Sequence, residues 1–309
     1  MKNDPVKLIV TSKANLQFKY GKKFTAVERL LVKLQKADVK KKLDAKIVYI
    51  DDAASARKAG ITAVKSVTPK ECKRAVDDLY NKHTPVYITL VGAQDVIPFQ
   101  EITNPADDDD SVVPTDLPYA CDAPFSTTID AFVGPTRVVG RIPDIPGQGD
   151  PAYLTTVINN SINQKPIDPE QYRKYFSISA WVWRKSTEKS LHNMFGQNGN
   201  LQLSPPVEGS FTKTQLKPLT HFFNCHGAPR DPGYYGQKGK SFPQAIRAGV
   251  LDKNIAPGTV AAAECCYGAE LYDPTQLGVE ELSIANTYLA NNALGFLGSS
   301  TIAYGPSDD

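Results

Sequence analysis

The chain of 309 residues has few cysteines, no long apolar run and almost no net charge. Its five cysteines, at positions 72, 121, 225, 265 and 266, are odd in number and have no CxxC spacing, which argues against a disulfide framework. No run approaches the ~20 apolar residues of a membrane span, and the first apolar run, near Val10, is too short for a signal peptide. With 35 basic and 33 acidic residues, the chain carries no polyelectrolyte signal for nucleic acid or anionic membranes. We therefore expect a cytoplasmic globular protein whose function depends on a local site, with no nucleic-acid or membrane partner.

Nucleotide-binding motifs are also missing. Neither GxxxxGK[ST] nor GxGxxG follows any predicted strand, which argues against a nucleotide-dependent enzyme on a doubly wound sheet. We accordingly expect no cofactor.

The N-terminal half alternates apolar strands with amphipathic helices. Strands are predicted at Lys7–Ser12, Ala45–Asp51 and Val86–Gly92. A helix is predicted over Phe24–Lys41, where apolar residues have helical spacing and Thr25 and Glu28 form a capping-box pattern. A second capping box, Thr68–Glu71, begins another helix, which carries Cys72 on its apolar side. This β-α-β-α-β order predicts an α/β fold with mostly parallel sheets.

A long loop is expected from Gln100 to about Ile129, with four adjacent carboxylates at Asp107–Asp110. Calcium loops usually alternate their ligands and include a turn glycine, which is missing here, so a solvated loop is the favoured interpretation and calcium the alternative. Strand character returns over Asp130–Pro143, and a segment rich in proline and glycine follows. A boundary near residues 145–170 divides the chain into subdomains 1–150 and 165–309.

Two apolar strands of the C-terminal half end in reactive side chains followed by glycine. One is Leu219–Gly227, which ends in Asn–Cys–His–Gly, and the other is Thr259–Ala269, which contains Glu–Cys–Cys–Tyr–Gly. Ligands of open α/β sheets bind beyond the carboxyl ends of the strands, so adjacent ends would bring His226 and Cys266 together as a dyad. Two further strands are expected, at Tyr175–Trp183 and Ala293–Gly298. Three helices are expected as well: one that begins after a cap at Ser186 or Thr187, one over Phe242–Leu251 and one over Val279–Leu289.

Neighbouring strand residues face opposite sides, so only one of Cys265 and Cys266 can address a cleft. The same alternation argues against a zinc site built from Cys225, His226, Cys265 and Cys266, because structural zinc ligands are usually spaced by two or more residues. Buried cysteines and a satisfied histidine without any chemistry remain an alternative.

Several segments resemble, in order, the gingipain-type cysteine peptidases. These segments are Leu90–Gly92 with Ile97–Pro98, Thr115–Ala120, Val139–Pro143, Asn224–Gly227, Glu264–Gly268 and Gly298–Ile302. The resemblance covers nearly the whole chain and implies a caspase-like, three-layer α/β/α fold with two subdomains. It also implies a cysteine endopeptidase acting on protein or peptide substrates. Relatives continue beyond Ser307–Asp309, so we expect a truncated or processed form.

The resemblance implies roles for particular residues. Cys266, two residues before the glycine, is the expected nucleophile, His226 is its proton shuttle, and the backbone N–H groups of Gly227 and Cys266 form the oxyanion hole. Cys265 is then a packing residue.

Specificity and a third catalytic member are less well defined by the sequence. The family's acid that orients the histidine has no counterpart at Trp181–Trp183, so we assign no third member. Glu188 is the candidate acid for an arginine or lysine at P1, and Tyr304 the candidate aromatic wall, although both are equally compatible with ordinary surface residues. The alternative function is a caspase-like scaffold used for interaction alone.

Overall fold

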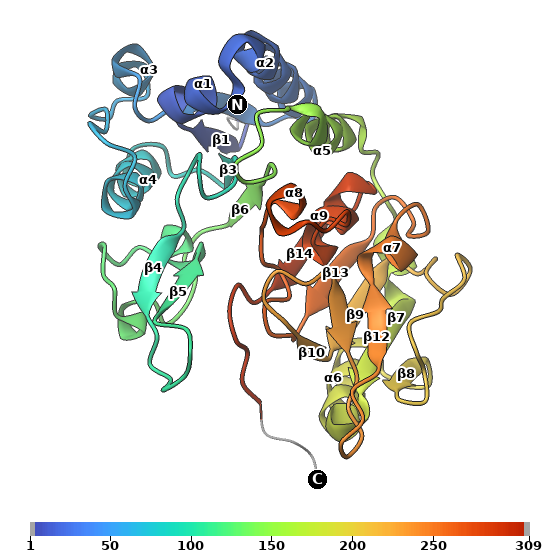
Figure 1. Cartoon of the computed structure of the whole chain (residues 1–309). Coiled ribbons are helices and arrows are strands. Elements are labelled where there is room, and N and C mark those ends of the chain that lie inside the picture. The colour runs from blue at the N-terminus through green and yellow to red at the C-terminus, as the bar shows by residue number, and fades with distance from the viewer. Residues whose placement is uncertain (1–3, 306–309) are drawn as a thin grey trace. The chain divides into compact units, whose positions relative to one another are not determined.

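The structure, a computed structural model, describes residues 4–305, and the chain end at Ser307–Asp309 lies outside them. The chain folds into two compact units, of which the first ends at Asn163 and the second begins at Gln164. The expected first subdomain ended at residue 150, whereas the first unit also includes helix α5 (Ala152–Asn163). Both units are mixed α/β structures with a parallel sheet (Figure 1). No helix in this described part is long and apolar enough to cross a membrane.

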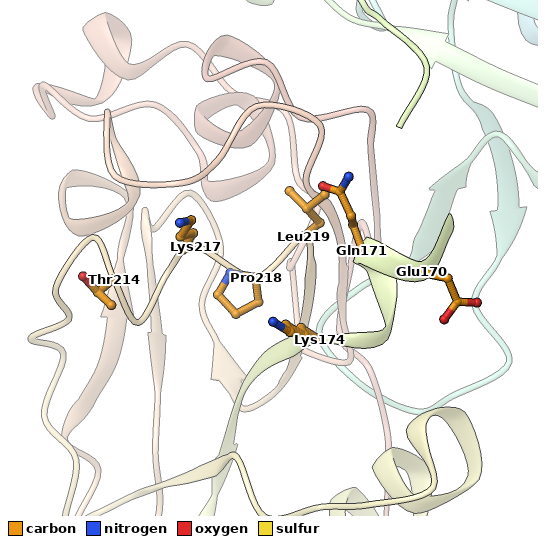
Figure 2. Close-up of a pocket in the computed structure, with 7 residues that line it drawn as sticks. All are labelled: Glu170, Gln171, Lys174, Thr214, Lys217, Pro218 and Leu219. Atoms are coloured by element: carbon orange, nitrogen blue, oxygen red, sulfur yellow. The ribbon is translucent and has the colours of Figure 1, made fainter. Parts of the chain in front are cut away.

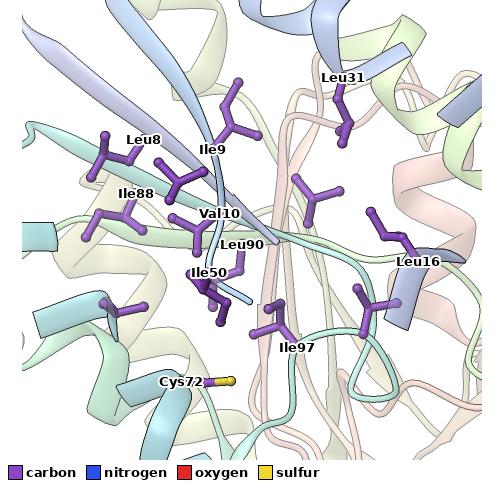
Figure 3. Close-up of a cluster of buried hydrophobic side chains, with 14 of the residues drawn as sticks. Leu8, Ile9, Val10, Leu16, Leu31, Ile50, Cys72, Ile88, Leu90 and Ile97 are labelled. Carbon is purple, nitrogen blue, oxygen red and sulfur yellow. The ribbon is translucent and has the colours of Figure 1, made fainter. Parts of the chain in front are cut away.

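The first unit is organised around a four-stranded parallel sheet in the order β2-β1-β3-β6. Its strands are β1 (Val6–Thr11), β2 (Asp44–Tyr49), β3 (Tyr87–Val91) and β6 (Val139–Ile142). Its helices are α1 (Lys13–Tyr20), η1 (Gly21–Lys23), α2 (Phe24–Lys40), α3 (Ala53–Lys58), α4 (Pro69–His83) and α5. Leu8, Ile9 and Val10 are all fully buried although successive strand side chains face opposite sides. Both faces of the sheet are therefore covered, as Figure 3 shows for the surrounding core.

Two predicted helix starts had different outcomes. Thr68 caps α4 as predicted, since its Oγ1 accepts a hydrogen bond from the backbone N–H of Glu71 at 3.3 Å. The predicted cap at Thr25 is wrong, because α1 continues through η1 into α2 and Lys23 already has helical backbone angles. The buried face of α2 agrees with the predicted spacing, and Cys72 is fully buried on α4.

The segment predicted as a long loop contains an antiparallel pair, β4 (Gln100–Thr103) and β5 (Val112–Thr115), with Asp107–Asp110 between the strands. Two short 3₁₀ turns follow, η2 (Leu117–Ala120) and η3 (Ile129–Ala131). Ile102, Cys121 and Phe132 form a small core in this segment. The strand predicted from Asp130 begins only at Val139, the first residue of β6.

Arg141 on β6 joins the three N-terminal segments that carry the family resemblance. Its guanidinium forms a two-point ion pair with Asp116, at 2.6 and 2.8 Å, and donates to the carbonyl oxygens of Gly92 and Ile97. Such a planar five-donor group satisfies a carboxylate and two carbonyls at once. These motifs thus have a structural reason to occur together.

The second unit contains a five-stranded parallel sheet in the order β14-β13-β9-β7-β8. Its strands are β7 (Tyr175–Ala180), β8 (Leu201–Ser204), β9 (Thr220–Asn224), β13 (Val260–Ala263) and β14 (Gly295–Gly298). The helices and 3₁₀ turns are η4 (Pro169–Arg173), η5 (Trp181–Trp183), α6 (Arg184–Phe195), α7 (Ala248–Leu251), α8 (Pro274–Leu277) and α9 (Ile284–Ala290). A small antiparallel sheet, β10 (His226–Gly227), β11 (Gly233–Tyr235) and β12 (Gln244–Arg247), lies between β9 and β13 in the chain.

The helix predicted over Phe242–Leu251 is wrong for most of its length. Gln244–Arg247 instead pairs with β11, and only Ala248–Leu251 is helical. Pairing with a strand distant in sequence overrides the local apolar pattern. The predicted Ser186 or Thr187 cap is also wrong, since α6 begins at Arg184 and Thr187 is fully buried inside it.

Candidate active site

The strand pairing brings the two predicted motifs to one edge of the sheet. β9 and β13 are parallel neighbours with Phe223 opposite Ala263, and the N–H of Glu264 continues the ladder by donating to the carbonyl of Phe223 at 2.8 Å. β9 ends at Asn224 and β13 at Ala263, so His226 and Cys266 come two and three residues after these strands. They therefore leave the sheet at the carboxyl ends of adjacent strands, where ligands of such sheets bind.

Gly227 lies against the backbone of Cys266. A Cβ atom at Gly227 would lie 1.9 Å from the carbonyl oxygen of Cys266 and 3.1 Å from its carbonyl carbon. Real Cβ atoms do not approach so closely, so glycine is required by this contact.

The adjacent cysteines have different surroundings. Cys265 is 1% exposed and belongs to the apolar core, where burial and the neighbouring Cys225 raise its pKa well above the usual thiol value. Cys266 is only half-buried. Because the thiolate is the reactive form, Cys265 is inert and Cys266 is the member of the pair that can react. The predicted packing role of Cys265 agrees with its position.

A tight turn presents Cys266. The N–H of Gly268 donates to the carbonyl of Cys265 at 3.1 Å, and Tyr267 at the third position has a φ of 53°. This is the pattern of a type II turn, which favours glycine where tyrosine stands. A non-glycine residue in this region costs about 1 kcal/mol or more and often occurs at functional sites. The N–H of Tyr267 donates to the carbonyl of Thr301 at 2.7 Å and helps to hold the turn.

The segment after β14 contacts the thiol. The N–H of Ala303 donates a hydrogen bond to Cys266 Sγ at 3.4 Å, and the Cys266 thiol donates to the carbonyl oxygen of Ala303 at 3.5 Å. The backbone N–H of Cys266 has no acceptor within residues 4–305. Tyr304 follows Ala303 immediately and is 68% exposed.

Aromatic rings and an amide surround His226. The ring centroids of Trp183 and Phe242 lie 4.5 and 5.4 Å from that of the imidazole. Nε2 of His226 lies 2.7 Å from Oε1 of Gln237. Sequence reasoning missed Gln237 and Phe242, because both belong to the irregular segment around β11 and β12, where no local periodicity marks them.

Glu188 lies on α6 and is half-buried. The preceding residue, Thr187, receives a hydrogen bond from Nδ2 of Asn224 at 3.0 Å, so this helix contacts the end of β9. Within the residues that the structure describes, no hydrogen bond or ion pair joins Glu188 to His226 or Cys266. The structure thus brings together Gly227 and Cys266, and places Glu188 next to Thr187, the residue that contacts the end of β9.

A pocket of about 510 Å³ in the second unit lies away from these residues (Figure 2). Its lining comprises Glu170, Gln171, Lys174, Thr214, Lys217, Pro218 and Leu219. These residues precede β7 and β9, so the pocket belongs to the amino ends of the strands, opposite to the edge that carries His226. Because of this position, the pocket is not part of the candidate site at His226 and Cys266.

In the acidic loop, the carboxylate of Asp108 is hydrogen-bonded within the loop itself. Oδ1 of Asp108 accepts hydrogen bonds from Nδ2 of Asn104 at 2.8 Å and from the N–H of Asp110 at 2.7 Å. In residues 4–305, no three His, Cys, Asp or Glu side chains are grouped as metal ligands.

Comparisons of the chain with protein-family models, with curated proteins and with solved structures found no match. The family resemblance therefore rests on the sequence motifs quoted above.

Proposed function

We propose that the protein is a caspase-like, gingipain-type cysteine endopeptidase in which Cys266 is the nucleophile and His226 the general acid and base. The observation that carries the proposal is the contact between Gly227 and the Cys266 backbone at the carboxyl ends of adjacent parallel strands. It is supported by the difference between Cys266, which is partly exposed, and Cys265, which is buried with a raised pKa.

The reaction proceeds in two steps. The Cys266 thiol gives its proton to His226, and the thiolate attacks the scissile carbonyl to form a tetrahedral oxyanion. His226 then protonates the leaving amine as the C–N bond breaks, which leaves a thioester. In the second step His226 takes a proton from water, and the resulting attack releases the acid and restores the thiol.

The oxyanion is held by the backbone N–H groups of Gly227 and Cys266. The N–H of Cys266 has no acceptor within the described chain, and the missing side chain at Gly227 allows the backbones of the two residues to lie in contact. Removing one such donor typically costs about 3 kcal/mol of transition-state stabilisation.

Substrate preference belongs to the same proposal. Glu188 accepts an arginine or lysine at P1, and Tyr304 forms a wall of that subsite. Glu188→Gln is then expected to lower kcat/KM for a P1-arginine peptide but not for a P1-alanine peptide. Equal values for the variant and the native protein would exclude Glu188 from the subsite.

Paired cysteine variants test the activity. Cys266→Ala should abolish hydrolysis of a fluorogenic peptide library, whereas Cys265→Ala should remain folded and active. A thiol-reactive peptidyl probe should label the native protein and Cys265→Ala, but not Cys266→Ala. If the native protein neither cleaves the library nor takes up the probe, the non-catalytic scaffold is the better function.

A further inference from the structure

The side chain of Gln237 is oriented so that its oxygen faces the imidazole of His226. Oε1 lies 2.7 Å from Nε2 of His226, while Nε2 of Gln237 donates to the carbonyl of Gly239 at 3.4 Å. An amide oxygen only accepts hydrogen bonds, so Nε2 of the histidine must carry the proton. The other ring nitrogen, Nδ1, is then the acceptor of the neutral imidazole.

The backbone of Gln237 is fixed on both sides. Its N–H donates to the carbonyl of Ser204 at 3.1 Å, and its carbonyl accepts from the N–H of Val182 at 3.2 Å. The preceding Gly236 approaches the same segment so closely that a Cβ there would lie 2.2 Å from the carbonyl oxygen of Ser204. The amide is therefore anchored at the ends of β7 and β8, next to the strand that delivers His226.

The ring of His226 is also held by its aromatic neighbours. Trp183 and Phe242 contact the imidazole, and Trp183 belongs to η5, the same turn that contains Val182. The η5 turn thus holds the backbone of Gln237 through the N–H of Val182 and the imidazole of His226 through the ring of Trp183. Rotation of the imidazole would break the bond to Gln237 and disturb both ring contacts.

We infer that Gln237 is the positioning residue of His226, in the place where the chain has no acid. It holds the tautomer with the proton on Nε2, so that Nδ1 accepts the Cys266 proton and later delivers it to the leaving amine. This inference rests on the proposed function for its catalytic consequence. A neutral amide orients the ring without the charge by which a carboxylate would favour the protonated imidazole.

Two substitutions separate orientation from charge. Gln237→Leu removes the acceptor with little change in size, and Gln237→Glu keeps an acceptor and adds a charge. Gln276→Leu and Gln276→Glu, on the exposed surface of α8, are the matched controls. The rate of Cys266 carboxamidomethylation by iodoacetamide, measured against pH by peptide mass spectrometry, needs no knowledge of the substrate.

We expect Gln237→Leu to slow alkylation of Cys266 near neutral pH by about tenfold, which corresponds to losing one hydrogen bond to the charged form of the histidine. Gln237→Glu should retain rapid alkylation and move the alkaline limb of the profile upward by about one pH unit, because its carboxylate stabilises the protonated imidazole. Profiles of both Gln237 variants that coincide with those of the Gln276 controls would overturn the inference.

Nitrogen NMR of the imidazole provides a readout that is independent of catalysis. The native protein should show His226 protonated on Nε2, with the signal identified by its loss in His226→Gln, and Gln237→Leu should show a mixture of tautomers. A native Nδ1-protonated ring would refute the positioning role even in an active peptidase. Conversely, the expected tautomers together with no peptide hydrolysis would refute the proposed function and leave the role of Gln237 in orienting the ring intact.

Discussion

Mild acid should destabilise the second unit through His221, a buried histidine on β9 that is distinct from the proposed catalytic one. His221 is 1% exposed; its Nε2 donates to the carbonyl of Pro218 at 3.0 Å, and its Nδ1 accepts from the hydroxyl of Tyr288 at 2.5 Å. Both ring nitrogens of the neutral form are thus satisfied. Burial lowers the pKa of His221 to about 4, from an ordinary value of 6.5.

The sign of the effect follows from proton uptake. Below about pH 6.5 the unfolded chain protonates this histidine, whereas the folded chain resists protonation down to about pH 4, so acid favours unfolding. One pKa unit corresponds to 1.36 kcal/mol. The free energy of unfolding should therefore fall by about 2 kcal/mol between about pH 7.5 and about pH 5, from this group alone.

Tryptophan fluorescence is a selective probe, because both tryptophans of the chain, Trp181 and Trp183, lie in the second unit. Urea titrations across this pH range would be compared for the native chain and His221→Gln, which keeps polar atoms but does not titrate. The difference in unfolding free energy between the two proteins should change by the predicted amount. If the two pH profiles run parallel, His221 is not the buried titrating group that we describe.

Two further outcomes are expected. Gly227→Ala should lower the stability of the second unit by about 2 kcal/mol or more through overpacking and abolish Cys266 reactivity, because its Cβ would overlap the Cys266 carbonyl. The control Gly295→Ala on β14, with no atom within 4 Å of its Cβ, should have little effect. Differential scanning calorimetry measures the stability and alkylation the reactivity, and a fully stable, reactive Gly227→Ala protein would contradict the contact. A chelator should leave the melting temperature unchanged, because the Asp108 carboxylate already accepts hydrogen bonds from Asn104 and from the N–H of Asp110. Calcium bound at Asp107–Asp110 at a hundredfold excess over its Kd would instead raise the free energy of unfolding by about 2.7 kcal/mol, and a chelator would then lower the melting temperature.

Local patterns were sufficient for the elements that build the sheets. The apolar spacing of α2 and the Thr68 cap of α4 depend on residues three or four positions apart, and the structure has both. The apolar runs before His226 and Cys266 likewise predicted two strands, and these strands are parallel neighbours. Sequence alone sufficed here because helix and strand periodicity is a local property.

Other features were decided by contacts between residues far apart in the chain. The pairing of β12 with β11 replaced a predicted helix. This outcome does not follow from the residues of the segment itself, because tertiary packing outweighs differences in local propensity of about 1 kcal/mol.

The candidate site divides in the same way. The sequence by itself determined that a histidine and a cysteine, each followed closely by glycine, would stand at strand ends. The expectation that only one of the two adjacent cysteines faces outward rested on strand alternation, whereas both cysteines lie in the turn after β13. The tertiary structure decided that Cys265 is the buried member, that Gly227 touches Cys266, and that Gln237 meets His226. Burial and hydrogen bonding between distant segments depend on how strands pair and turns pack, and no local pattern records that.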